Sequence, residues 1–216
     1  MFRAIALFFL LATQAPACEV ALVLAIDISG SIDAGEYVQQ SEGLALALRD
    51  SAVADALVQG KAALTVMHWS GTGRQAVVMD WQRVETTADV AVFADRVMAT
   101  PRAFDASDTA VGEAISFATS LFAAMPDCAR KVIDVSGDGP ENAGFTVGRA
   151  RSDAQKNGVQ INAIAIEDMG ASVPITNFYR EWVITRGGFV MTARGLQDYP
   201  RAMREKLLRE LAKPAS

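Results

Sequence analysis

Three oxygen-bearing side chains follow one apolar segment at every second position, and their types suit a hard cation. Asp27, Ser29 and Ser31 come directly after the continuously apolar residues 20–26. If this segment is a buried strand, the three side chains gather at the rim of a sheet. Carboxylate and hydroxyl oxygens favour Mg²⁺, Mn²⁺ or Ca²⁺ over Zn²⁺. Alone, the pattern is weak evidence, because the same residue types also form turns that cap helices.

Two later segments carry side chains of the same kind. Thr109 opens a helical pattern, and Asp138 follows the apolar stretch 132–136. Asp108 and Glu141 add carboxylates to the same rim. For Asp108 we expect either a cap on the following helix or a place behind the metal ligands. Glu141 either stands behind the ligands or lies in a solvated loop.

The elements that must position these residues alternate between strand and helix. Apolar and β-branched runs predict strands at 20–26, 61–69, 75–84, 132–136, 159–166 and 188–192, the second and third forming a hairpin. Helical periodicity predicts helices from a cap at Asp33 to about residue 57, and at 87–100, 109–125, 146–157, 175–185 and 196–211. This order predicts an α/β fold with a doubly wound, mostly parallel six-stranded sheet, one antiparallel edge strand and helices on both faces.

Composition limits the classes of function. The chain has 216 residues, of which 51% are hydrophobic and 21% charged, as expected for one globular domain. Its net charge is −5 and its isoelectric point is about 5.0. An acidic surface argues against binding to nucleic acid and to anionic membranes.

The first residues have the features of a signal peptide. Arg3 precedes the apolar stretch 4–12, and Ala15-Pro16-Ala17 fits a cleavage site with small residues. The apolar stretch is about half of the ~20 residues that a membrane-spanning helix needs. We therefore expect residues 1–17 to be removed, leaving a domain at 18–216 in the periplasm or the extracellular medium. The alternatives are a lipid on Cys18 and a buried first strand.

The two cysteines have matching places in the pattern. Cys18 and Cys128 each stand just before an apolar strand that leads to one of the acidic residues. If these strands are parallel neighbours, the cysteines start side by side, about 4.8 Å apart. An exported chain meets an oxidising compartment, so we expect a disulfide, with two buried thiols as the alternative.

Together the three acidic and hydroxyl-bearing segments resemble the von Willebrand factor A superfamily across residues 18–211. In that superfamily an Asp-x-Ser-x-Ser motif, a distant Thr and a later Asp before Gly build a metal-ion-dependent adhesion site. The segments Ile133-Asp134-Val135-Ser136-Gly137-Asp138-Gly139-Pro140 and Trp69-Ser70-Gly71 resemble an uncharacterised bacterial branch of it.

The resemblance implies a metal site and a mode of binding. Ser29 and Ser31 would bind the ion directly, and Thr109 directly or through water. Asp27 and Asp138 would supply charge and orient the hydroxyls. Mg²⁺ suits this set best, with Mn²⁺ and Ca²⁺ as alternatives. A partner's carboxylate would fill the open position on the ion.

These expectations describe an exported module that binds a protein or peptide partner, and not an enzyme. The alternatives are a metal-assisted hydrolase and a structural or assembly factor with a vestigial metal site. A hydrolase needs a general base. His68 is the only histidine, and it lies within a strand pattern away from the site motifs.

Overall fold

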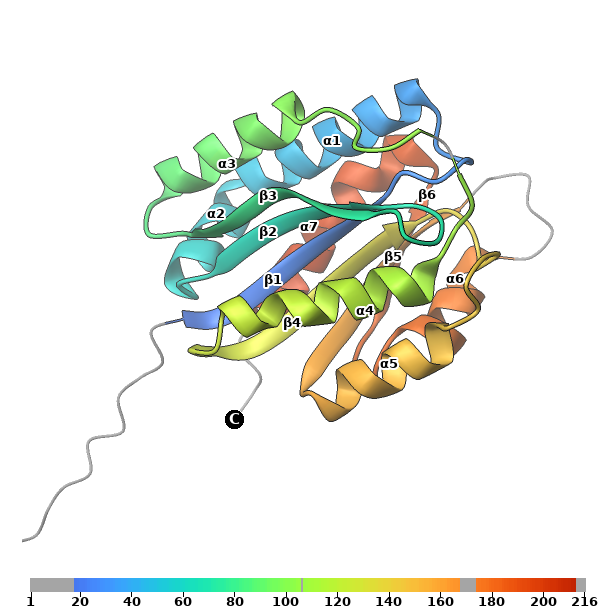
Figure 1. Cartoon of the computed structure of the whole chain (residues 1–216). Helices are drawn as coiled ribbons and strands as arrows, with labels where there is room; N and C mark the ends of the chain where they lie inside the picture. The colour runs from blue at the N-terminus through green and yellow to red at the C-terminus, as the bar shows by residue number, and fades with distance from the viewer. Residues whose placement is uncertain (1–17, 106, 168–173, 213–216) are drawn as a thin grey trace, which may run out of the picture.

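The computed structural model describes residues 18–105, 107–167 and 174–212, and the predicted signal peptide (1–17) lies outside them. A six-stranded sheet with the order β3-β2-β1-β4-β5-β6 forms the centre of the domain (Figure 1). Only β3 runs antiparallel to its neighbour, β2, among the described strands. The predicted sheet is confirmed. The strands are β1 (Cys18–Asp27), β2 (Ala63–Trp69), β3 (Gln75–Arg83), β4 (Cys128–Gly137), β5 (Val159–Glu167) and β6 (Val190–Arg194).

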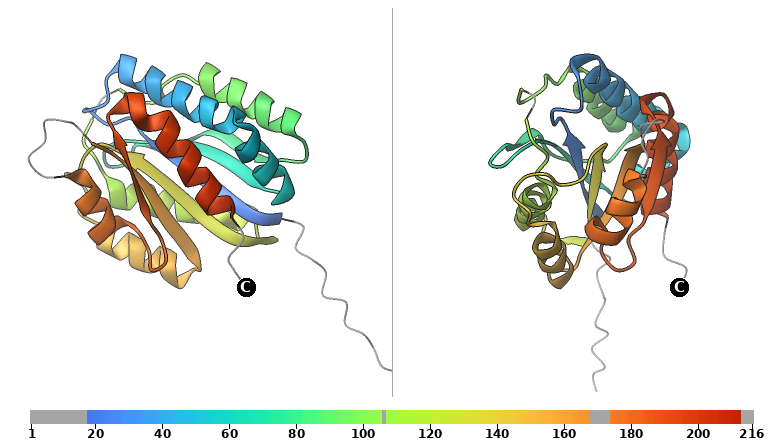
Figure 2. Two further views of the ribbon diagram at one scale, coloured as in Figure 1. Left: turned by 180° about the vertical axis from the view of Figure 1, so that it is seen from behind. Right: turned by 90° about the vertical axis from the view of Figure 1, so that its right-hand side faces the viewer.

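Helices cover both faces of this sheet, which gives three layers (Figures 1 and 2). One face carries α1 (Ala34–Arg49), α2 (Ser51–Gln59), α3 (Thr87–Ala99) and α7 (Tyr199–Leu211). The other carries α4 (Val111–Leu121), α5 (Val147–Lys156) and α6 (Ile175–Phe178). Three short helical turns complete the described elements: η1 (Phe122–Ala124), η2 (Tyr179–Val183) and η3 (Leu196–Asp198). None of the helices in these ranges is long and apolar enough to cross a membrane.

The central strand β1 shows why its sequence is apolar throughout. Successive side chains of a strand point to opposite faces, so a strand between two helical layers must be apolar at every position. Leu22, Leu24 and Ile26 pack in the core on the α1 side. Ala21, Val23 and Ala25 pack in the core on the α4 side.

Cys18 and Cys128 stand opposite each other in the register of β1 and β4 and form the predicted disulfide. Their Cα atoms are 4.4 Å apart. The bond joins the beginnings of two neighbouring parallel strands, as the sequence pattern predicts. Disulfides of this structural kind persist outside the cytoplasm.

Four predicted helices differ in the structure, and in one of them, 109–125, α4 ends at Leu121 and the 3₁₀ turn η1 follows. The helix expected from the cap at Asp33 to about residue 57 is two helices, because Asp50 has an extended backbone and its carboxylate accepts hydrogen bonds from the amides of Ala52 and Val53. The cap itself is present, with Glu36 completing the capping box. The segment 175–185 is one short α-helix followed by the π-helical turn η2. The segment 196–211 begins with the 3₁₀ turn η3 before α7.

Candidate metal site

The predicted site lies at the ends of β1 and β4, where the connections that leave the two strands run to opposite sides of the sheet. From β1 the chain proceeds to β2 on one side, whereas β4 pairs with β1 on the other. Asp27 is the last residue of β1, and Asp138 directly follows β4. Ligands of open α/β sheets bind beyond the carboxyl ends of strands at such a switch point. The fold therefore brings together two carboxylates that are far apart in the sequence.

The Asp27 carboxylate is buried and held on one side only. Its Oδ1 accepts a hydrogen bond of 2.7 Å from the amide of Ser29. Its Oδ2 is buried and has no hydrogen-bond partner within the described ranges. The pKa of Asp27 is raised from 3.8 to about 7, chiefly by burial and to a lesser extent by repulsion from Asp138. A cation beside this carboxylate would reverse that shift by stabilising the ionised form.

The two serines connect Asp27 to Asp138. The Ser29 and Ser31 hydroxyl oxygens are 3.3 Å apart, and the Ser31 hydroxyl donates a 2.6 Å hydrogen bond to Asp138 Oδ1. A turn closed by a 3.0 Å bond from the Ile32 amide to the Ser29 carbonyl holds both serines in this place. Burial raises the pKa of Asp138 as well. The first and last parts of the predicted motif thus meet through a direct contact.

Thr109 is brought to the same rim by its backbone. Its amide donates a 2.7 Å hydrogen bond to Asn142 Oδ1, and its carbonyl accepts a 2.9 Å bond from the Asn142 amide. Two residues earlier, the Ser107 carbonyl accepts a 2.6 Å bond from the Gly30 amide. The segment around Thr109 is therefore held between the serine turn and the segment after β4.

Glu141 and Asp108 have different roles from each other. Glu141 Oε1 accepts a 2.8 Å bond from the Gly112 amide, and Oε2 accepts a 3.1 Å bond from the Val147 amide. One carboxylate therefore accepts hydrogen bonds from backbone amides in the first turns of both α4 and α5. Asp108 is exposed, and the residue in the cap position before α4 is Ala110, with no side-chain cap. The cap predicted for Asp108 is wrong, because Glu141 supplies the acceptor from another segment.

Arg102 supports the site and was not identified from the sequence. Its guanidinium donates hydrogen bonds of 2.6 and 3.1 Å to the carbonyls of Ile28 and Ser29. These carbonyls belong to the turn that carries the serines, and the positive charge also favours ionised Asp27. Arg102 follows Pro101 in a connecting segment, where no periodicity marks it as part of the site.

The donor set suits a hard divalent cation. The predicted set consists of two carboxylates and three hydroxyls, those of Asp27, Ser29, Ser31, Thr109 and Asp138. Within the ranges that the structure describes, no group of three or more His, Cys, Asp or Glu side chains comes together as a metal site. Hydroxyl and carboxylate oxygens are the ligands of Mg²⁺, Mn²⁺ and Ca²⁺. The residues therefore fit the predicted metal by their chemistry.

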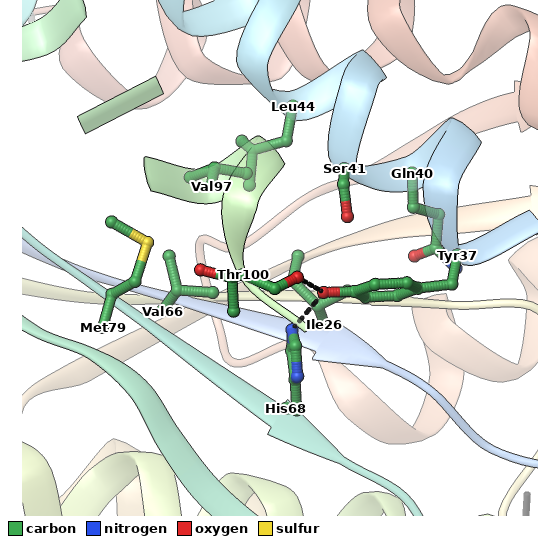
Figure 3. A pocket seen from close by; sticks show the side chains of 10 residues that line it. All are labelled: Ile26, Tyr37, Gln40, Ser41, Leu44, Val66, His68, Met79, Val97 and Thr100. Atoms are coloured by element: carbon green, nitrogen blue, oxygen red, sulfur yellow. Dashed lines mark hydrogen bonds between the residues drawn. The ribbon is translucent and has the colours of Figure 1, made fainter. Parts of the chain in front are cut away.

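His68 lies in a small enclosed pocket on the α1 side of the sheet (Figure 3). Its Nε2 is 3.5 Å from the Tyr37 hydroxyl, which donates a 2.7 Å hydrogen bond to the Thr100 carbonyl. Burial lowers the pKa of His68 from 6.5 to about 4. The pocket measures about 10 Å³, roughly the space of one water molecule. His68 is thus a neutral, buried side chain at pH 7.

An open groove of about 430 Å³ lies beside Asp138. Its lining includes the buried side chains of Ile32 and Ile166 and the charged side chains of Glu36, Glu167 and Arg194. The groove therefore connects the candidate metal site with the side of the sheet where β5 and β6 end.

Solved structures of von Willebrand factor A domains share this fold. A von Willebrand factor type A protein from Catenulispora acidiphila has a TM-score of 0.65 at 19% identity, covering 90% of this chain and 43% of that chain. The pilus adhesin SpaC from Lactobacillus rhamnosus GG has a TM-score of 0.68 at 12% identity, covering 92% and 30%. Proximal thread matrix protein 1 from the mussel byssus, solved with a zinc-occupied MIDAS motif, has a TM-score of 0.61 at 18% identity, covering 90% and 46%.

This chain spans less than half the length of each of these three proteins. At such identities the likeness shows the fold alone. A comparison with curated protein sequences gives no match. The profile of the family "Protein of unknown function (DUF1194)" matches residues 17–215. The chain therefore belongs to the DUF1194 family, and its domain has the von Willebrand factor A fold.

Proposed function

We propose that this protein is an exported binding module that recognises a protein or peptide partner through a divalent cation. The cation would be held by two carboxylates and three hydroxyls, those of Asp27, Ser29, Ser31, Thr109 and Asp138. The observation that carries the proposal is the 2.6 Å hydrogen bond between Ser31 and Asp138. It joins the serine turn to the segment after β4, so that a hydroxyl and a carboxylate from distant parts of the sequence lie within reach of one ion.

Charge in the site supports a cation. Burial raises the pKa of both Asp27 and Asp138, and the negative charge of Asp138 raises the pKa of Asp27 further. A bound divalent ion would neutralise both and offer an open position to an incoming carboxylate. Mg²⁺ is our first choice, because it retains waters and takes few protein carboxylates. Zn²⁺ belongs in the assay too, since the mussel protein was solved with zinc in its MIDAS motif.

The groove beside Asp138 gives a partner room to reach the ion. At about 430 Å³ it accommodates several side chains of an extended peptide. An adhesin among the proteins of this fold, SpaC, is a precedent for a role in attachment. The partner that we propose carries an exposed Asp or Glu that binds the ion, with its neighbouring residues in the groove.

The hydrolase alternative finds no general base in His68, the only histidine of the chain. His68 is buried and its pKa is lowered to about 4, so it neither reaches a substrate nor holds a proton at pH 7. A scaffold with a vestigial metal site has no use for five intact donor side chains. Binding is therefore the function that the site supports best.

The first test is calorimetric titration of the metal-stripped protein, residues 18–216, with Mg²⁺, Mn²⁺, Ca²⁺ and Zn²⁺. We expect saturable binding by the wild type and none by Asp27→Ala. The control is Asp55→Ala, which removes an exposed carboxylate on α2. Equal cation binding by the wild type and Asp27→Ala would overturn the proposed site.

The second test concerns the partner. Immobilised wild-type protein is offered envelope extract with Mg²⁺ or with chelator, beside immobilised Asp27→Ala, and retained proteins are identified by mass spectrometry. We expect a protein retained only by the wild type with Mg²⁺, and loss of binding when its contacting Asp or Glu is changed to the amide. Retention that is unaffected by chelator would favour the scaffold alternative.

Export is tested separately. The N-terminus of the protein recovered from the cell envelope is determined by mass spectrometry. We expect the chain to begin at Cys18 without a lipid, because Cys18 is bonded to Cys128. Retention of residues 1–17, or a diacylglyceryl group on Cys18, would contradict this.

A further inference from the structure

Three buried polar groups meet behind the Asp27 carboxylate. Asp27 Oδ2, the Trp69 indole nitrogen and the Tyr179 hydroxyl are all buried, and none has a hydrogen-bond partner in the part of the chain that the structure describes. Buried polar groups are nearly always hydrogen-bonded, so three unpaired groups in one region need an explanation. None of the contacts described above uses the Trp69 nitrogen or the Tyr179 hydroxyl.

The three groups border one small space above Gly137. A Cβ atom at Gly137 would lie 2.3 Å from the Tyr179 hydroxyl and 2.8 Å from Asp27 Oδ2. It would lie 3.3 Å from Cζ2 of the Trp69 ring, on the side of the indole that carries the nitrogen. Only glycine leaves this space open. The last residue of β4 thus allows groups from three other segments to approach each other.

The chemistry of the three groups is complementary. An indole N–H can only donate a hydrogen bond, a tyrosine hydroxyl can donate one, and an ionised carboxylate only accepts. Asp27 Oδ1 is already held by the amide of Ser29, whereas Oδ2 is the free acceptor. The Trp69 and Tyr179 donors, for which the described residues provide no acceptor, therefore lie around Asp27 Oδ2, for which they provide no donor.

The positions of Trp69 and Tyr179 are set by the secondary structure that carries them. Trp69 is the residue of β2 paired with Asp27 in the register of the sheet. Tyr179 is the first residue of the π-helical turn η2. π-Helical turns are rare and often occur at functional sites. The widened turn begins at the residue whose hydroxyl faces Asp27.

We propose that Tyr179, together with Trp69, is a positioning residue of the metal site. The two donors hold Asp27 Oδ2 by hydrogen bonds when the carboxylate is ionised and a cation is bound, so that both oxygens of Asp27 are fixed. This inference rests on the proposed function. Groups that orient a metal ligand in this way commonly contribute about 10- to 100-fold to metal affinity.

The test compares two tyrosine variants in the same calorimetric titration with Mg²⁺. Tyr179→Phe removes only the hydroxyl, and we expect its affinity for Mg²⁺ to fall about 10- to 100-fold. Its metal-free thermal unfolding should be unchanged or slightly raised, since the hydroxyl lacks a partner there. The control is Tyr199→Phe, an equally buried tyrosine whose hydroxyl faces Ser136 at 3.4 Å. We expect the control to bind Mg²⁺ as the wild type does.

A second measurement needs no substitution at Tyr179. Titration of ¹⁵N-labelled wild-type protein with Mg²⁺ should shift the indole N–H resonance of Trp69, assigned with Trp69→Phe. The indole of Trp81 is the internal control, because it already donates to the Leu121 carbonyl at 3.3 Å. This readout remains available if Tyr179→Phe does not fold.

The outcomes separate this inference from the proposed function. If Tyr179→Phe binds Mg²⁺ with wild-type affinity and the Trp69 resonance does not move, the positioning role is wrong although the metal site stands. If the wild type binds no cation while folding normally, the proposed site fails and the inference fails with it. If Tyr179→Phe loses affinity for Mg²⁺ and Tyr199→Phe does not, the result supports both the metal site and the positioning role.

Discussion

The ammonium nitrogen of Lys206 lies 2.6 Å from a carboxylate oxygen of Asp134, and both side chains are shielded from solvent. Lys206 projects from α7 and Asp134 from the middle of β4. Lys206 also pairs with Glu210, which accepts a 2.8 Å hydrogen bond from the Asn162 amide group on β5. This buried network explains an aspartate inside an apolar strand. It attaches α7 to the neighbouring strands β4 and β5.

Removing the cation of this network should be far more damaging than removing an exposed one. Lys206→Met leaves two buried carboxylates without a counter-charge, and we expect it to lower the free energy of unfolding by about 3–5 kcal/mol. The comparison is Arg204→Met, a substitution on the same helix as Lys206. It breaks a half-exposed pair between Arg204 and Asp50, the cap of α2, and should lower the free energy of unfolding by less than about 1 kcal/mol. Urea denaturation of both variants measures the difference. Equal effects would mean that the buried pair contributes no more than the surface pair.

Asp138→Asn should separate stability from metal binding. The substitution removes a charge that repels Asp27 and raises its pKa. We therefore expect the metal-free variant to be as stable as the wild type or more so, and to gain no stability on addition of Mg²⁺. The wild type should gain about 2.7 kcal/mol at a Mg²⁺ concentration 100 times the dissociation constant. Thermal unfolding with and without Mg²⁺ measures both effects. A variant that Mg²⁺ still stabilises would exclude Asp138 from the site.

Glu141→Ala should weaken two helices at once. Its carboxylate accepts hydrogen bonds from the amides of Gly112 and Val147, in the first turns of α4 and α5. Loss of these contacts should cost about 1–2 kcal/mol of unfolding free energy. Mg²⁺ affinity should also fall, because the adjacent Asn142 positions Thr109. The control is Glu42→Ala, an exposed carboxylate on α1. If both variants unfold at the same denaturant concentration, Glu141 has no capping role.

His68 should make the protein less stable as the pH falls. Burial lowers the pKa of His68 from 6.5 to about 4, so between these values the unfolded chain binds the proton more readily than the folded one. The contribution of His68 is therefore fully present above pH 6.5 and is lost as the pH falls towards 4. Over the whole window the loss amounts to about 3 kcal/mol.

The measurement for His68 is denaturation by urea across this range of pH, for the wild type and for His68→Gln. Glutamine stays neutral, so the variant lacks this contribution while the acidic residues titrate in both proteins. The difference in unfolding free energy between the two should change with pH. A constant difference would show that His68 takes up its proton without opposing the fold.

The layers of this fold were predictable because they depend on local periodicity. A continuously apolar β1 requires helices on both sides, and the strand–helix alternation gives the parallel order. The ligand positions were predictable for a similar reason. Asp27 and Asp138 stand at the ends of apolar strands, where the chain must leave the sheet.

The remaining features depend on contacts between distant segments, which leave no local pattern. Lys206 reads as a solvated helix residue until Asp134 is placed opposite it. Glu141 reads as a loop residue until the beginnings of α4 and α5 converge on it. The helix break at Asp50, by contrast, is a local feature. Asp50 caps α2 as Asp33 caps α1, so the sequence does carry a signal for it. There the apolar spacing continued across the break and concealed it.

The disulfide lies at the opposite end of β1 and β4 from the candidate metal site, as the strand directions in Figure 1 show. A tensile load applied at Cys18 would pass through the sulfur bridge into β4 as well as along β1. The force would thus be divided between the two central strands, and peeling β1 from its neighbour would require breaking a covalent bond. The bridge therefore makes the beginnings of β1 and β4 the end of the sheet at which these two strands are hardest to separate.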